Sequence, residues 1–247
     1  MHWPSLAAFR FADEELPSIT AFVEPGVSTF AVEDVYRRSV LPMAIQALGA
    51  EALHASGVMA AGGVVAFAAR ARTGKSTIAY ALSRRGFCQW ADDAVALRVA
   101  GGQVMTMPLP FEVRLRPESS ALFGFDQRRF RQFAPDVVVA QAEATSVPLA
   151  AVCLLRRMEN QTPTVPAVIG RLTPQRAFSA VLTHAHEFNP HDVERRKRML
   201  HAYLELVDTV PVYDVQFAVG GEWLDGVLDT LIETLSLEST AVACAAM

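Results

Sequence analysis

The chain has 247 residues, of which 51% are hydrophobic and 19% are charged, and its net charge is −4 at pH 7. This composition is typical of a globular protein with one large domain or two small ones, and the acidic balance disfavours a general nucleic-acid binder. Apolar runs stay below the roughly 18 residues of a membrane span, and residues 1–16 lack the basic start and apolar core of a signal peptide. Three scattered cysteines without a zinc pattern (Cys88, Cys153 and Cys244) suggest a reduced, cytoplasmic protein.

The first half of the chain is predicted to hold two helices and two β-hairpins. Helices are read from the 3.6-residue period, and hairpins from apolar runs that flank glycine pairs. In chain order we expect a helix over 33–48 with a break near Pro42, strands 53–60 and 64–69 around Gly62-Gly63, a helix over 78–85 that stops at Gly86, and strands 94–100 and 103–107 around Gly101-Gly102.

The second half is predicted to hold three strands and three helices, joined by a loop excursion after the first strand. The expected elements are strands 111–115, 151–157 and 210–217, helices that open at Thr173-Pro174 and Asn189-Pro190, and a last helix near 222–236. The apolar stripe expected on the middle helix is Met199, Leu200, Tyr203, Leu204 and Val207. Because strands and helices mix without regular alternation, we expect a compact α/β fold with a mixed sheet flanked by helices. The small-residue tail, 239–247, is expected to be flexible.

A phosphate-binding loop is predicted between the strand 64–69 and the helix that follows it. The residues that carry this prediction are Arg72, Thr73, Gly74, Lys75, Ser76 and Thr77. Loop N–H groups and a helix N-terminus can cradle phosphate, a lysine neutralises it, and a hydroxyl can hold magnesium. The usual opening glycine is replaced by Ala69, which costs energy if that position needs a positive φ. The alternatives are a chance match and a loop that no longer binds nucleotide.

Further motifs lie at informative distances from this loop. His54 stands 21 residues before Lys75, and Asp92-Asp93 stand 17 and 18 residues after it, with RLRPES at 114–119 and VPVYDV at 210–215. Together these motifs resemble the HPr kinase/phosphorylase family. The resemblance covers roughly residues 35–217 and is closest to the short stand-alone HPr-kinase-like proteins, which include the serine kinases of lasso-peptide gene clusters.

The resemblance implies a P-loop kinase domain related to phosphoenolpyruvate carboxykinase, with ATP and Mg²⁺ as cofactors. It would make Asp93 the general base on the acceptor hydroxyl, with Asp92 beside it to orient or hold metal, and His54 to tune the pair. Ser76 would ligate magnesium, and Glu112 would be a second metal carboxylate, although its spacing from Asp93 is shorter than in the bacterial regulators. We expect the domain over 1–238, with 1–34 as an N-terminal extension.

The expected function is transfer of the γ-phosphoryl group of ATP to a serine hydroxyl, on a lasso-type precursor peptide. The alternatives are a kinase of a small hydroxylated metabolite or of HPr, a nucleotide-binding sensor without transfer activity, and a general NTPase. Arg114 and Arg116, on one face of the strand expected there, could reach phosphate or a peptide carboxylate, or could be ordinary surface charge. The run 194–198 is expected to be a solvated helix face. No zinc site is predicted at His184, His186 and His191, because no carboxylate or cysteine lies at ligand spacing from them. The expected partners are the nucleotide and a peptide or protein with the acceptor serine, with no nucleic acid or membrane, and the chain could form a homo-oligomer.

Overall fold

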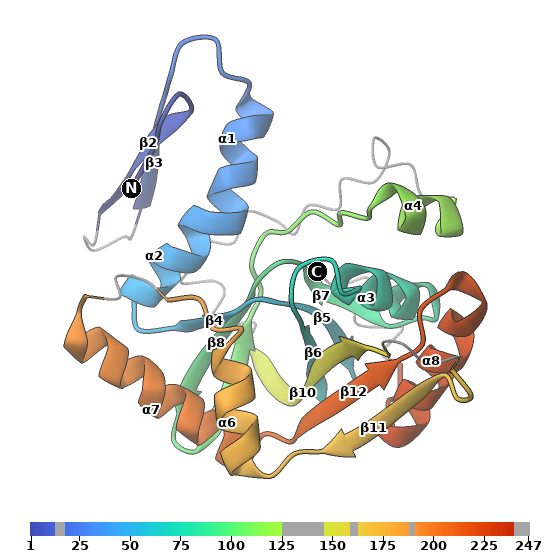
Figure 1. Ribbon diagram of the computed structural model, residues 1–247. Coiled ribbons are helices and arrows are strands. Elements are labelled where there is room, and N and C mark those ends of the chain that lie inside the picture. Colours follow the sequence, from blue (N-terminus) through green and yellow to red (C-terminus); the bar gives the residue numbers. More distant parts are fainter. Residues whose placement is uncertain (13–17, 125–145, 159–162, 188–190, 240–247) are drawn as a thin grey trace.

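The computed structural model describes residues 1–12, 18–124, 146–158, 163–187 and 191–239 and has one large sheet and one small sheet (Figure 1). The large sheet has nine strands in the order β4-β8-β9-β10-β6-β5-β7, with β12 beside β10 and β11 beside β12. These strands are β4 (Glu51–Leu53), β5 (Ala55–Ala60), β6 (Gly63–Ala68), β7 (Cys88–Ala91), β8 (Val95–Ala100), β9 (Gln103–Met107), β10 (Val147–Arg157), β11 (Ala167–Arg171) and β12 (Val212–Phe217). The mixed α/β fold expected from the sequence is therefore confirmed.

The long strand β10 joins the parallel and antiparallel parts of the large sheet. Its first residues pair antiparallel with β9, where Val147 lies opposite Thr106. Further along, Val152 lies opposite Ala66 of β6 and Val212 of β12, both in parallel pairing. The sheet curls because one strand changes partners along its length.

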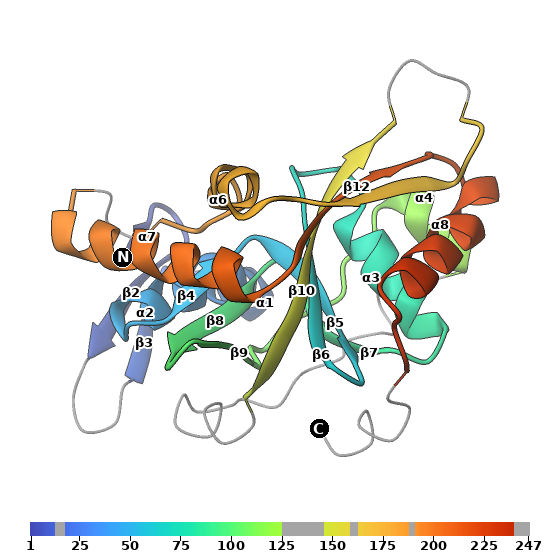
Figure 2. The same ribbon diagram turned by 90° about the horizontal axis from the view of Figure 1, so that it is seen from below.

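Helices cover both faces of the sheet around β6 and β10 (Figure 2). They are α3 (Lys75–Arg84) and α8 (Gly221–Thr234) on one face, and α6 (Pro174–Leu182) and α7 (Val193–Thr209) on the other. Side chains of β6 alternate between the two cores, since Val64 and Ala66 pack with α6 and α7 while Val65 and Phe67 pack with α3 and α8. This double burial explains why β6 reads as a continuous apolar run.

The N-terminal segment forms the small antiparallel sheet and a long helical arm. The strands are β1 (His2–Trp3), β2 (Ala7–Ala12) and β3 (Ser18–Val23), and the arm is α1 (Thr29–Val35), the π-helical turn η1 (Tyr36–Val40) and α2 (Leu41–Ala47). The break expected near Pro42 is this π-helical turn, in which the Leu41 N–H bonds to the Tyr36 carbonyl. Pro42 has no N–H to donate within the helix. Just before it, the backbone hydrogen bond reaches five residues back instead of four, and the helix continues beyond Pro42.

Several local predictions agree with the structure. The hairpins β5–β6 and β8–β9 close at Ala60 opposite Gly63 and at Ala100 opposite Gln103. Helix α3 ends just before Gly86, which has a φ of +92°, and α6 begins with Pro174 after Thr173. Asn189 and Pro190, which were predicted to open a helix, lie outside the described residues, as does the tail from 240. Helix α7 begins at Val193 and is capped by Asp192, whose side chain accepts the Arg195 N–H.

Other predictions were wrong, and the reasons are physical. Residues 111–115 form no strand because Pro108, Pro110 and Pro117 interrupt the ladder of N–H donors, and the segment leads into α4 (Pro117–Phe123). On α7, Leu204 is exposed and Leu206 takes its place in the core. Cys153 is a free, buried thiol, while Cys244 lies outside the described residues. None of the helices in the described parts of the chain is long and apolar enough to cross a membrane.

Candidate functional site

The loop between β6 and α3 turns sharply onto the N-terminus of α3. Two residues take left-handed backbone conformations, Arg72 with a φ of +70° and Gly74 with a φ of +129°. Gly74 is the N-cap of α3, so the free N–H groups and the positive end of the helix dipole lie at the end of this loop. Arg157, the last residue of β10, braces the loop from outside by donating to the carbonyls of Arg72 (2.5 Å) and Thr73 (3.0 Å).

Ala69, at the position where glycine was expected, fits without backbone strain. Its φ is not positive, and its methyl group is buried in the core between the sheet, α3 and α8. The energetic penalty considered from the sequence therefore does not arise, since alanine is disfavoured only in left-handed conformations.

Lys75 is the first residue of α3, and its side chain is buried under the loop. Its ammonium contacts the carbonyl of Ala69 at 3.2 Å and Nε2 of His54 at 3.1 Å. An ammonium has three N–H donors, so one is left for an oxygen of a ligand. Burial lowers the pKa of Lys75, while the carboxylates of Asp93 and Asp92 act in the opposite direction.

His54 links Lys75 to the carboxylate pair. Its Nδ1 lies 3.0 Å from the backbone carbonyl of Asp93, and Nε2 faces the Lys75 ammonium. A neutral ring with its proton on Nδ1 satisfies both contacts, because Nδ1–H then donates and Nε2 accepts. Burial, and next the charge of Lys75, lower the pKa of His54, which agrees with the neutral form.

Asp92 and Asp93 lie in the turn between β7 and β8, which lets adjacent side chains reach the same site. Asp92 is buried, and its Oδ1 accepts hydrogen bonds from the hydroxyls of Ser56 (2.6 Å) and Ser76 (2.8 Å). Its Oδ2 accepts the backbone N–H of Arg114 at 3.3 Å. Burial, followed by the neighbouring Asp93 carboxylate, raises the pKa of Asp92 to about 6.

Asp93 is the more accessible carboxylate of the pair. Its side chain is 29% exposed, its φ is +66°, and its Oδ2 lies 3.1 Å from Nε of Arg38. A left-handed aspartate is uncommon and places the carboxylate away from the strand direction. Asp93 is therefore the more open of the two to a ligand, whereas Asp92 lines the cleft as a buried carboxylate.

These residues surround a cleft of about 450 Å³ at the N-terminus of α3. From the predicted set it is lined by His54, Arg72, Gly74, Lys75, Ser76, Thr77, Asp92, Asp93, Arg114 and Arg116. A second cavity of about 510 Å³ adjoins it across Arg72, Gly74, Thr77 and Arg116, and is also lined by Thr73. Its other walls include Phe217, Leu224 and Leu122. The two cavities thus share the loop, and the second has apolar walls in addition to charged ones.

The oxygen groups next to Lys75 fit a magnesium ion that is held mainly by a nucleotide. The hydroxyl of Ser76 and the buried carboxylate of Asp92 lie side by side, and no basic side chain is within ion-pair distance of Asp92 in the described chain. Mg²⁺ is commonly bound by one or two protein oxygens together with phosphates and waters. In the same part of the chain, no group of three His, Cys, Asp or Glu side chains is arranged as a dedicated metal centre.

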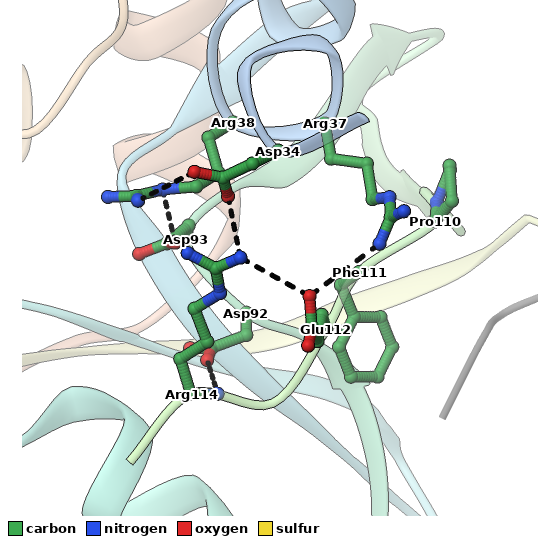
Figure 3. A pocket seen from close by; sticks show the side chains of 9 residues that line it. All are labelled: Asp34, Arg37, Arg38, Asp92, Asp93, Pro110, Phe111, Glu112 and Arg114. Atoms are coloured by element: carbon green, nitrogen blue, oxygen red, sulfur yellow. Dashed lines mark hydrogen bonds and ion pairs between the residues drawn. The ribbon is translucent and has the colours of Figure 1, made fainter. Parts of the chain in front are cut away.

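Glu112 does not share the cleft with Ser76. Its carboxylate lies 3.3 Å from Arg114 and 3.8 Å from Arg37, in a small charged cavity on the far side of Asp92 (Figure 3). The role expected for Glu112 as a metal ligand is thus not favoured by its ion pairs. Arg114 is held between Glu112 and Asp34 (2.9 Å), while Arg116 is exposed.

Several residues of the site were not predicted from the sequence. Arg38 and Arg157 line the cleft, and Ser56 contacts Asp92. Ser119 of α4 also lines the cleft and lies 2.9 Å from the hydroxyl of Thr77. Two of these residues lie in motifs that the sequence offered, Ser56 in LHAS (53–56) and Ser119 at the end of RLRPES (114–119).

The basic run 194–198 is not wholly a solvated face. Arg195 is 6% exposed and makes a two-pronged ion pair with Glu51, both contacts at 2.7 Å, while its neighbours in the run are exposed. His186 packs edge-to-face against His54, with ring centres 5.8 Å apart. The backbone N–H of His54 donates to the backbone carbonyl of His184. His184 and His186 thus help to fix the position of His54 through these two contacts.

Comparisons with known proteins give matches among solved structures alone. No family model matches the sequence, and no curated protein matches it. Among solved structures, the HPr(Ser) kinase/phosphatase from Coxiella burnetii is similar with a TM-score of 0.38 and 17% identity, over 75% of this chain and 93% of that chain.

Proposed function

We propose that the chain is an ATP- and Mg²⁺-dependent kinase that transfers the γ-phosphoryl group to a serine hydroxyl, and that residues 1–238 form its catalytic domain. The observation that carries this proposal is the meeting of Lys75, Ser76, Asp92 and Asp93 in one cleft at the N-terminus of α3. Phosphoryl transfer depends on positioning, charge neutralisation and a base near the attacking oxygen. Each of these tasks has a suitable group in this cleft.

The phosphate side of the proposed site is the β6–α3 loop. The N-terminus of α3 and the remaining donor of Lys75 would bind the β- and γ-phosphates, which are the anions that such a terminus attracts. Arg72 lies beside them on the cleft wall. Ser76 and Asp92 would hold Mg²⁺, which when bound neutralises charge that develops on the phosphates. The apolar cavity across the loop would receive the nucleoside.

The acceptor side of the proposed site is Asp93. The serine oxygen would attack the γ-phosphorus while the bond from that phosphorus to the β–γ bridging oxygen breaks, so that ADP leaves. The Asp93 carboxylate would take the hydroxyl proton, a role that requires hydrogen-bond reach of the acceptor. Its exposure favours it over the buried Asp92 for this task.

The acceptor in this proposal is a ribosomally made, lasso-type precursor peptide. Support comes from the sequence motifs LHAS, ADD, RLRPES and VPVY, which resemble the stand-alone serine kinases of such gene clusters. A small hydroxylated metabolite and the HPr protein are the competing acceptors, and the experiment below separates them.

The test is an intact-mass assay with ATP and Mg²⁺ and three acceptors: a lasso-type precursor peptide ending in serine, HPr protein, and free serine. A gain of one phosphate on the peptide is expected from the wild type and from neither Lys75→Ala nor Asp93→Asn. Nucleotide binding is measured in parallel by calorimetry, and Asp93→Asn should retain it. Transfer only to HPr or to free serine would show that the acceptor is not the peptide. Nucleotide binding without any transfer would favour a sensor. ATP hydrolysis that needs no acceptor would favour an NTPase.

A further inference from the structure

The N-terminal helical arm places charged side chains at the edge of the candidate active site. Arg37 and Arg38 lie in the π-helical turn η1, one residue apart in sequence, yet both reach the segment around Asp92 and Asp93 (Figure 3). Single π-helical turns inside α-helices occur often at functional sites, because they rotate side chains out of the regular helical positions. The turn here follows from the missing N–H of Pro42.

The arm and the cleft are joined by charges of alternating sign. From the arm, Glu33 contacts Arg37 (2.5 Å), and Arg37 lies 3.8 Å from Glu112. Glu112 contacts Arg114, Arg114 contacts Asp34, and Asp34 lies 3.6 Å from Arg38. The series ends where Nε of Arg38 contacts the Asp93 carboxylate at 3.1 Å (Figure 3).

Asp93 has two anchors of different origin. His54 of the main sheet holds its backbone carbonyl, and Arg38 of the arm holds its carboxylate. Asp93 lies outside the strands with a φ of +66°, and in the described chain its carboxylate forms an ion pair with Arg38. The direction in which the carboxylate faces the cleft therefore depends on Arg38.

We propose that Arg38 is a positioning residue for Asp93, and that the N-terminal arm is thereby an integral part of the active site. This inference rests on the proposed function, in which Asp93 accepts the proton of the acceptor hydroxyl. Arg38 is 50% exposed at the cleft wall, so it holds the carboxylate without blocking it from the acceptor. The nucleotide side of the site, at Lys75 and Ser76, makes no contact with Arg38 in the described structure.

The test compares Arg38→Met and Arg38→Lys with the control Arg196→Met. Arg196 is also an exposed arginine that pairs with an acidic side chain, Glu187 at 3.4 Å, and it lines neither cavity. For Arg38→Met we expect kcat for phosphoryl transfer to fall about tenfold or more, because small misplacements of catalytic groups have effects of this size. The KM for ATP and the affinity for ADP should stay within about twofold, and Arg38→Lys should recover part of kcat.

A double-mutant cycle separates positioning from a general structural effect. The cycle is read on the residual transfer of Asp93→Asn, followed over long incubations at high enzyme concentration, where Arg38→Met should lower the rate no further, because the group that it positions is gone. The inference is overturned if kcat of Arg38→Met equals that of the control, if the effects of the two substitutions multiply, or if Arg38→Met melts well below the control. A wild-type protein that transfers phosphate to no acceptor would instead overturn the proposed function, and this inference with it.

Discussion

Replacing Asp92 by asparagine should stabilise the metal-free protein at neutral pH and abolish its proposed transfer activity. Burial, and then Asp93, raise the pKa of Asp92 from its ordinary 3.8 to about 6. Because the pKa is higher in the folded state than in the unfolded state, the carboxylate destabilises the fold once it ionises. The penalty grows as the pH rises through this interval and is complete above it.

The magnitude follows from the pKa rise and the hydrogen bonds. A rise from 3.8 to about 6 corresponds to ~3 kcal/mol of destabilisation at high pH, and about half of this is present at pH 5. Asparagine keeps an oxygen for the hydroxyls of Ser56 and Ser76, but its amide cannot accept the Arg114 N–H, a loss of about 1 kcal/mol. The net stabilisation expected at pH 8 is ~2 kcal/mol.

The assay is urea unfolding of wild type and Asp92→Asn at pH 5, 6, 7 and 8 with a chelator present. The free energy of unfolding of the variant relative to the wild type should increase by about 1 to 2 kcal/mol from pH 5 to pH 8. Asp208→Asn, an exposed aspartate on α7, should show no such increase. A difference between Asp92→Asn and wild type that is the same at all four pH values would refute the reasoning, because the buried charge would then carry no penalty.

Three further substitutions test the fold and the loop. Ala69→Gly should leave ADP affinity within about twofold in calorimetry and lower stability by about 1 kcal/mol, because Ala69 needs no left-handed conformation; a clear gain in affinity would contradict this. Arg195→Met should lower the free energy of unfolding by ~3 kcal/mol or more, since it leaves Glu51 buried without its partner, and adding Glu51→Gln should restore much of the loss. Gly63→Ala should lower the urea midpoint strongly, because a Cβ there would lie 2.3 Å from the carbonyl oxygen of Pro148; a wild-type midpoint would refute this.

Local sequence signals accounted for the elements around the loop. Glycine pairs between apolar runs predicted both hairpins, and the change from apolar strand to polar loop to amphipathic helix predicted α3. Asp92 and Asp93 come directly after the end of β7, where two adjacent side chains can reach one site, as they could not from within a strand. In these cases the interaction that decides the structure lies within a few residues.

Long-range contacts explain what could not be predicted. The sequence gives Arg195 the same appearance as its exposed neighbours, and only Glu51, 144 residues away, makes it a buried residue. In the sequence, Arg38 and Arg157 look like ordinary charged residues of a helix and a strand. Their partners, Asp93 and Thr73, are brought to them only by the tertiary fold. The strand β11 is short and largely exposed, so it lacks a clear apolar pattern.

The position of β10 has a consequence for how the chain folds. Its parallel partners, β6 and β12, lie far away in sequence on either side, at 63–68 and 212–217. Pairing over such separations requires closure of long loops before the contacts form, which slows folding. During synthesis, one edge of β10 stays unpaired until residue 217 has left the ribosome. We therefore expect the chain to fold slowly. We also expect the incompletely folded chain to be prone to aggregation through this edge, and a chaperone to shorten the time spent in that state.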